Sequence, residues 1–231
     1  MRHDASGTLL RGEVGRPRDD LGGSLMRVLV TGFQPFGGED DNPSWEVARR
    51  LPKSILGAEV DRLEVPVVFG EGPRLVCREA DRLGADAVLC LGQAGGRAGI
   101  TVEFVGINQE DASIPDNAGN QPVASLIEPG GPDARFATVP ARHMVVRMRE
   151  GGVPASVSYT AGTYVCNDML YEVLGHLGTG EGRALGGFVH LPYLPSQVIG
   201  KGPSTPSMSL DDMVRGVTLG LEEVVRAVET R

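Results

Sequence analysis

Short apolar runs alternate with amphipathic stretches along most of the chain. The apolar runs, rich in β-branched residues, are typical of strands, and the amphipathic stretches repeat apolar positions at helical spacing. Strands are expected at residues 27–32, 58–65, 87–91, 101–108, 155–159 and 185–191. Helices are expected at 42–51, 73–83, 140–150, 168–177 and 210–228. This alternation predicts an α/β fold: a single domain, phosphorylase- or hydrolase-like, with a mainly parallel twisted sheet and helices on both faces.

Several ends of these elements carry signals of their own. Asn42 can cap the first helix, with Pro43 at its first position, and Gly84 can end the second helix. Ligands of such sheets bind beyond the carboxyl ends of the strands. We therefore expect the 33–38 loop, the 92–97 loop and His190 to lie together at that edge. Residues 111–129 and 192–206 are rich in Pro, Gly and Asn and are expected to be exposed loops.

Residues 1–25 are polar and Gly-rich, without periodicity and without the apolar segment of a signal peptide. We interpret them as a disordered extension, or as a non-native one that precedes the true initiator Met26. Residues 26–231 then form the folded domain.

Composition narrows the classes of function. The 231 residues carry a net charge of −8 and no basic stripe, which argues against nucleic acid and anionic membranes as partners. No apolar run approaches the roughly 20 residues of a membrane span. The three cysteines cannot all pair, and none lies in a metal-type cluster, so a cytoplasmic protein without a metal is expected.

Cys166 is the leading candidate for chemistry. It lies between an expected strand and an expected helix, where backbone N–H groups and the positive end of the helix favour the nucleophilic thiolate. The alternative is a small buried core residue, as free cysteines often are. We interpret Cys77, near the apolar face of a helix, and Cys90, inside the 87–91 strand, as core residues.

A thiol nucleophile needs a base and a group that orients the base. His190 ends an apolar strand at the expected ligand edge, whereas His3 lies in the tail and His143 and His176 lie in helices. Glu103 is the only carboxylate in the 101–108 run, and pairing with an imidazolium would offset the cost of burying it. The alternatives are a core histidine and an exposed glutamate on an edge strand.

Several segments resemble the signatures of pyroglutamyl-peptidase I, the pyrrolidone-carboxylate peptidases. They are TGFQPFGG at 31–38 with NPSWE at 42–46, GQAGGR at 92–97 through Glu103 and Asn108, IPDN at 114–117 with GNQP at 119–122, GTYVCN at 162–167, and HLP at 190–192. They occur in the family's order and cover the chain from Arg27 to the C-terminal helix.

The resemblance implies a cysteine exopeptidase that removes an N-terminal pyroglutamyl residue from small peptides through a thioester. Cys166 would be the nucleophile, His190 the general base and acid, and Glu103 the group that orients the histidine. It implies no cofactor, and it implies a homotetramer with residues 26–231 as the peptidase domain.

A pocket for the lactam ring should be mostly apolar, with a few aimed hydrogen bonds. Phe33 and Phe36 are expected as flat walls, as in the family. The alternative, less favoured, is that they pack their own loop. Ile114, Tyr164 and Val165 are candidates for the remaining wall, and Gln93 for the polar atoms of the lactam.

Two positions depart from the family's usual arginines: Ser113 and Phe104. They motivate an alternative, a catalytically weak or silent protein that binds pyroglutamyl peptides. A nucleoside-phosphorylase-like enzyme is a third hypothesis, which no motif favours. Gly95 and Gly96 do not indicate a phosphate loop, because GxGxxG and the lysine of a P-loop are absent.

Overall fold

The computed structural model describes residues 25–178 and 184–231, and within them one sheet has the strand order β2-β3-β1-β4-β9-β5-β8. Its strands are β1 (Arg27–Phe33), β2 (Ser54–Ile55), β3 (Ala58–Val65), β4 (Ala87–Gln93), β5 (Ile100–Glu103), β8 (Ala155–Ser158) and β9 (Leu185–Leu191). Neighbouring strands are parallel except for β2 with β3 and β5 with β9. The prediction of a mainly parallel α/β sheet is confirmed.

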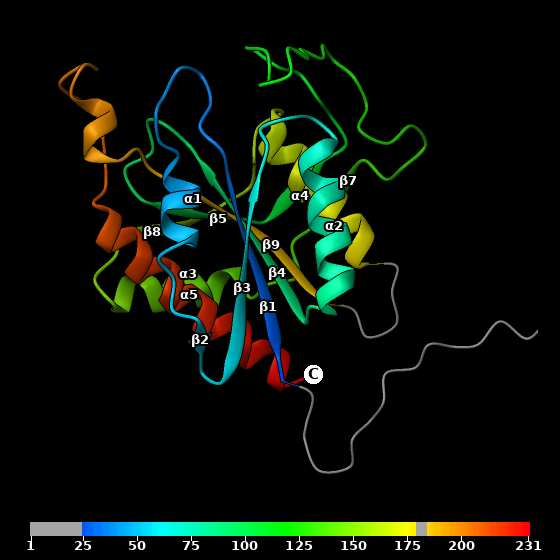
Figure 1. Cartoon of the computed structure of the whole chain (residues 1–231), viewed down its shortest axis with the longest axis vertical. Helices are drawn as coiled ribbons and strands as arrows, with labels where there is room; N and C mark the ends of the chain where they lie inside the picture. The colour runs from blue at the N-terminus through cyan, green and yellow to red at the C-terminus, as the bar shows by residue number, and fades with distance from the viewer. Residues whose placement is uncertain (1–24, 179–183) are drawn as a thin grey trace, which may run out of the picture.

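Helices cover both faces of this sheet (Figure 1). One face carries α1 (Pro43–Ala48), α3 (Ala141–Glu150) and α5 (Leu210–Glu229), and the other carries α2 (Glu71–Leu83) and α4 (Val165–Leu177). Each face of the sheet packs against its helices through an apolar core, and alternate residues of β1 belong to one core or the other. Val28 and Val30 pack towards α1 and α5, and Leu29 packs towards α2 and α4. On β9, Phe188 belongs to the α2–α4 side and Val189 to the other. His190, two residues after Phe188, therefore faces α4.

Both helix caps expected from the sequence are present in the structure. Asn42 Oδ1 accepts a hydrogen bond from the Ser44 amide at 3.1 Å, and Pro43 is the first residue of α1. Gly84 ends α2 with a φ of 59°, in the left-handed region that favours glycine. The interpretation of the first 25 residues concerns positions 1–24, which lie outside the described residues, and it stays a prediction.

Among the boundaries that differ from the sequence-based expectation, three bear on the site. The helix α1 ends at Ala48 instead of residue 51, and α4 begins at Val165, three residues early, so that Cys166 lies inside its first turn. The expected 101–108 strand is divided at Phe104 into β5 and β6 (Val105–Ile107). Here the Phe104 carbonyl accepts from the Ala137 amide, and β6 pairs with β7 (Ala134–Phe136) in a second small sheet.

The topology brings the candidate residues to one edge. The carboxyl ends of β1, β4 and β9 meet there, with Gly92 opposite His190 in the parallel register. Strand β5 runs the other way, with Thr101 opposite His190 and Glu103 opposite Phe188. The glutamate therefore reaches the histidine diagonally from inside the sheet, on the face that packs against α4.

Candidate active site

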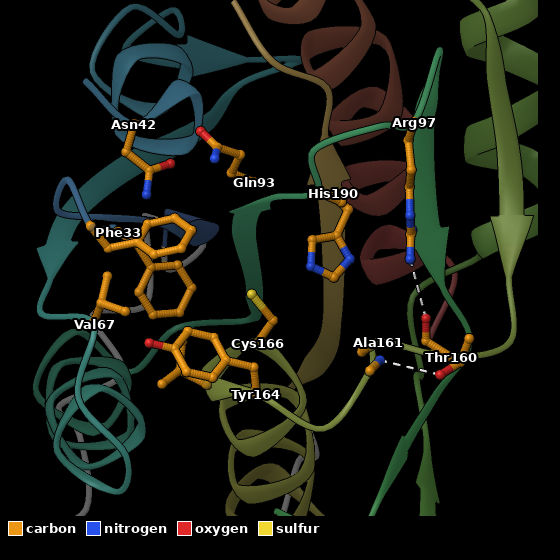
Figure 2. Close-up of a pocket in the computed structure, with 14 residues that line it drawn as sticks. Phe33, Asn42, Val67, Gln93, Arg97, Thr160, Ala161, Tyr164, Cys166 and His190 are labelled. Atoms are coloured by element: carbon orange, nitrogen blue, oxygen red, sulfur yellow. Dashed lines mark hydrogen bonds between the residues drawn. The ribbon is translucent and has the colours of Figure 1, made fainter. Parts of the chain in front are cut away.

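A cavity of about 270 Å³ lies at this edge. Figure 2 shows Cys166 and the His190 ring between two groups of residues. One group is apolar: Phe33, Phe36, Val67, Tyr164 and Val165. The opposite group contains Arg97, Thr160 and Ala161. Nucleophile and base candidates thus share one cavity with an apolar side and a polar side.

His190 and Glu103 form a buried pair. His190 is 4% exposed and Glu103 is fully buried, and Nδ1 of His190 lies 2.8 Å from Oε1 of Glu103. An ionised carboxylate only accepts hydrogen bonds, so Nδ1 carries the hydrogen. In the neutral imidazole Nε2 is then the proton acceptor, which is the form a general base requires.

Arg97 is a third member of this network, and the sequence analysis did not single it out. Its Nη1 lies 2.6 Å from the same oxygen, Oε1 of Glu103, and also donates to the Thr101 hydroxyl. Its Nη2 donates to the Thr160 carbonyl at 3.4 Å (Figure 2). The available signal was its place at the end of the 92–97 loop, a segment already expected at the ligand edge.

The protonation states follow from burial and these contacts. Burial raises the pKa of Glu103, but hydrogen bonds from His190 and Arg97 oppose burial, and the net pKa is lowered. Burial lowers the pKa of His190. The hydrogen bond and charge of Glu103 oppose burial, the positive charge of Arg97 acts with it, and the net pKa is lowered. The resting pair is therefore an ionised Glu103 and a neutral His190.

Cys166 is the second residue of α4 and is partly exposed. Its sulfur rests against β4: a Cβ added at Gly92 would lie 3.0 Å from Sγ. Gly92 is the residue opposite His190, so the bare backbone at this position leaves space for the thiol beside the imidazole.

Burial of the sulfur opposes the thiolate that was expected from the sequence. Burial, reinforced by the negative charge of Glu103, raises the pKa of Cys166 to about 12, although Arg97 acts in the opposite direction. The helix N-terminus also favours the thiolate, but this effect is smaller than the desolvation of the sulfur. The two pKa shifts therefore favour a neutral thiol beside a neutral imidazole.

The first turn of α4 is anchored by two polar side chains after Cys166. Asn167 binds the backbone of β6 through the Ile107 amide at 2.9 Å and the Ile107 carbonyl at 2.8 Å. Asp168 Oδ2 accepts from the Gly70 amide at 2.8 Å, while its Oδ1 is buried without a hydrogen-bond partner among the described residues. These contacts fix the position of the cysteine, and the sequence analysis had not assigned them.

The predicted pocket residues are mostly brought together. Phe33 is 2% exposed and packs against Phe188, with ring centres 6.4 Å apart. The Phe36 ring lies 6.3 Å from that of Tyr164, whose hydroxyl donates to the Pro115 carbonyl at 3.0 Å. Gln93 and Val165 also line the cavity, as do Val67 and Asn42, which the sequence analysis missed.

Ile114 is the exception. It is 43% exposed and does not line the cavity, contrary to the expectation that it would form part of the wall. The backbone next to it is held by the hydrogen bond from the Tyr164 hydroxyl to the Pro115 carbonyl. Val67, three residues before the Asp168-bound Gly70, is among the apolar residues that do line the cavity.

The two departures from the family pattern lie away from the cavity lining. Ser113 is exposed on its loop. Phe104 packs against Phe136 and Tyr159, with ring centres 5.6 and 5.7 Å away. In this chain the cation that contacts Glu103 is Arg97, and neither departure removes it.

Two properties of the described residues bear on metals and membranes. No group of three or more His, Cys, Asp or Glu side chains in this part of the chain is arranged to hold a metal ion. None of the helices in the described ranges combines the length and apolarity needed to span a bilayer.

Comparison with known proteins places these features in context. Residues 26–227 match the pyroglutamyl peptidase family model. The chain is 46% identical over 202 residues to pyrrolidone-carboxylate peptidase 2 of Caldanaerobacter subterraneus subsp. tengcongensis, covering 87% of this chain and 98% of that protein. It is 46% identical over 205 residues to the pyrrolidone-carboxylate peptidase of Treponema denticola, covering 87% and 94%. The crystal structure of pyroglutamyl peptidase I from Bacillus amyloliquefaciens is similar with a TM-score of 0.83 at 40% identity, covering 87% and 97%.

Proposed function

This chain belongs to the pyroglutamyl peptidase family, and we propose that it removes N-terminal pyroglutamate from small peptides by cysteine catalysis. The observation that supports the assignment of residues is the shared cavity: the Cys166 sulfur and the His190 ring face it together, and Glu103 orients the ring from behind. Cys166 is the nucleophile, His190 the general base and acid, and Glu103 the orienting carboxylate.

The neutral resting pair defines the first step. Nε2 of His190 takes the proton from Sγ as the sulfur attacks the pyroglutamyl carbonyl, so the thiolate forms only during the attack. Glu103, ionised and 2.8 Å from Nδ1, stabilises the imidazolium that results. The first backbone N–H groups of a helix have no intrahelical partner, and that of Cys166 is suited to stabilise the oxyanion.

The remaining steps complete the cycle. The C–N bond breaks as the imidazolium gives its proton to the leaving amine, which leaves a pyroglutamyl thioester on Cys166. A water molecule then loses a proton to His190 and attacks the thioester carbonyl. The C–S bond breaks, free pyroglutamate leaves, and the proton returns to the sulfur.

The pocket accounts for the choice of substrate. Phe33, Phe36, Val67, Tyr164 and Val165 offer an apolar surface to the faces of the five-membered ring, and Gln93 offers an amide to its polar atoms. An ordinary N-terminus carries a protonated amine, which would be buried here without a partner at a cost of several kcal/mol. The pocket therefore favours a neutral lactam over a free amino terminus.

The decisive test is release of p-nitroaniline from pyroglutamyl-p-nitroanilide. We expect turnover by the native protein and a loss of at least about 10³-fold in Cys166→Ala, with an unchanged far-ultraviolet circular dichroism spectrum. Prolyl-p-nitroanilide, which lacks the ring carbonyl and carries a protonated amine, is the matched substrate control. Binding of a pyroglutamyl peptide by calorimetry, without turnover, would instead establish the silent binding protein.

We also propose that the chain forms a homotetramer in the cytoplasm, as the resemblance implies. Cys77, Cys90 and Cys166 are all unpaired, which supports a reducing compartment. Light scattering coupled to size-exclusion chromatography measures the assembly directly.

A further inference from the structure

Gln197 joins three segments at the mouth of the cavity. It lies in the short 3-10 helix η1 (Pro195–Val198), outside the segments that resemble the family. Its Oε1 accepts from the Leu194 amide at 2.9 Å. Its Nε2 lies 2.9 Å from Oε1 of Gln93, 3.3 Å from the Asp41 carbonyl and 3.4 Å from Oε2 of Glu39. One side chain thus connects η1, the β1–α1 loop and the end of β4.

The neighbours of Gln197 determine which way its amide points. The Leu194 N–H can only donate, whereas the Asp41 carbonyl and the Glu39 carboxylate can only accept. The oxygen of Gln197 must therefore face Leu194, and its nitrogen must face the other two groups. If the oxygen and nitrogen of the Gln197 amide were exchanged, these three contacts could not be hydrogen bonds.

The orientation of Gln93 follows from that of Gln197. Because Nε2 of Gln197 donates, Gln93 must present its oxygen to it. This leaves Nε2 of Gln93 without a hydrogen-bond partner among the described residues, and Gln93 lines the cavity. Figure 2 shows the Gln93 amide above the phenylalanine side of the cavity, with its nitrogen turned downwards.

We propose that Gln197 is a specificity-determining positioning residue, which holds Gln93 so that its amide N–H points at the ring carbonyl of the substrate. The proposal rests on the proposed function, since it names how the lactam is read. The ring carbonyl is an acceptor and matches a fixed donor. A prolyl ring has no carbonyl at that position, so the donor would remain unpaired against it.

Gln197→Glu is the informative variant. A carboxylate keeps an acceptor for Leu194 but has no donor for Gln93, Asp41 or Glu39. Of these three partners only the Gln93 amide can offer a donor instead, so it is expected to rotate, donate to the new carboxylate and turn its oxygen into the cavity. Gln197→Met removes the restraint without imposing the opposite orientation. Lys201→Met is the matched control, because Lys201 lies on the same loop and binds Glu39 at 2.8 Å, with no contact to Gln93 among the described residues.

Two readouts separate ring binding from chemistry: the kinetics of pyroglutamyl-p-nitroanilide and competitive inhibition by 2-pyrrolidone, the bare lactam. For Gln197→Glu we expect the KM and the inhibition constant of 2-pyrrolidone to rise together by about tenfold or more, with kcat within about threefold. Gln197→Met should show a smaller rise in both, and Lys201→Met should stay within about twofold of the native protein.

A double-mutant cycle tests the route through Gln93. In a Gln93→Leu background, Gln197→Glu should cause no further rise in either constant. An equal rise in that background, or an unchanged inhibition constant for 2-pyrrolidone in the single variant, would overturn the proposal. Failure of the native protein to cleave the substrate would count against the proposed function, whereas differences among the variants in 2-pyrrolidone binding report on Gln197 alone.

Discussion

Nη1 of Arg97 lies 2.6 Å from Oε1 of Glu103, the same oxygen that lies 2.8 Å from Nδ1 of His190. One carboxylate oxygen therefore serves two cations when His190 is protonated during the reaction. The second oxygen, Oε2, is buried without a hydrogen-bond partner among the described residues. The position and charge of Glu103 thus depend on Arg97 as well as on His190.

Replacement of Arg97 by glutamine should change the pH dependence as well as the rate. Arg97 lowers the pKa of His190, so its loss should raise that pKa and move the acid limb of kcat/KM to higher pH. We expect kcat/KM at the optimum to fall by about 10- to 100-fold, because the carboxylate loses a charge-assisted hydrogen bond. Arg97→Lys should recover part of the shift. A loss of activity with an unmoved acid limb would indicate a merely structural role.

The native pH profile should reflect a neutral thiol and a neutral histidine. Burial lowers the pKa of His190 below its usual 6.5, so the base is available at neutral pH and kcat/KM should fall only as pH drops below that value. Burial raises the pKa of Cys166 to about 12, so no rise in activity from thiolate formation is expected between pH 7 and 9.

Alkylation provides an independent check on the thiol. In a variant with Cys77 and Cys90 replaced by serine, the rate of reaction of Cys166 with iodoacetamide should stay low at neutral pH and increase up to strongly alkaline pH. A titration midpoint below pH 7 would instead demonstrate a resting thiolate–imidazolium pair.

Gly92→Ala should damage the site without direct loss of a catalytic group. The new Cβ would lie 2.6 and 2.9 Å from ring atoms of Phe188 and 3.0 Å from Cys166 Sγ, so ring and sulfur must both shift. We expect a loss of about 100-fold in kcat/KM and about 1–3 kcal/mol in the free energy of unfolding. Gly200→Ala is the control, because its added Cβ meets nothing within 4 Å. Native-like turnover by Gly92→Ala would contradict the tight placement of the sulfur.

Asp168→Asn should stabilise the protein in a pH-dependent way. Burial raises the pKa of Asp168 from 3.8 to about 7, so the folded state favours the protonated form. The contribution of Asp168 to stability is therefore full below pH 3.8 and is lost as pH rises through about 7. Asparagine resembles the protonated form and can still accept from Gly70. Thermal unfolding at pH 8 should show that the free energy of unfolding of the variant is about 2–4 kcal/mol higher than that of the native protein, and this gain should shrink towards pH 4. An equal gain in stability at pH 8 and at pH 4 would contradict the raised pKa of Asp168.

The sequence predicted the main elements because their signals are local. Apolar runs such as 87–91 and the capping residues at Asn42 and Gly84 carry their structure in a few neighbouring positions. The division of the 101–108 run at Phe104 was missed because its β-type composition continues unbroken. Only the distant Ala137 amide, which binds the Phe104 carbonyl, shows where the chain leaves the main sheet.

The sequence also predicted most of the candidate site, and Arg97 and Ile114 are among the exceptions. Cys166, His190 and Glu103 were each predicted both from their chemistry and from the family motifs. Arg97 was missed because an arginine in a Gly-rich loop has the pattern of a solvated surface residue. Ile114 was misplaced because sequence does not show which side of an irregular loop a residue faces, and here it is 43% exposed.

The high proton affinity of Cys166 has a consequence for oxidative damage. Peroxides react with thiolates and hardly with thiols, so a sulfur whose pKa is about 12 is a poor target for conversion to sulfenic acid. Cys77 and Cys90 also have pKa values raised to about 12 by burial. Oxidation of Cys166 by peroxide should therefore require removal of its proton by His190, as the attack on a substrate does, and should slow when His190 is protonated at low pH.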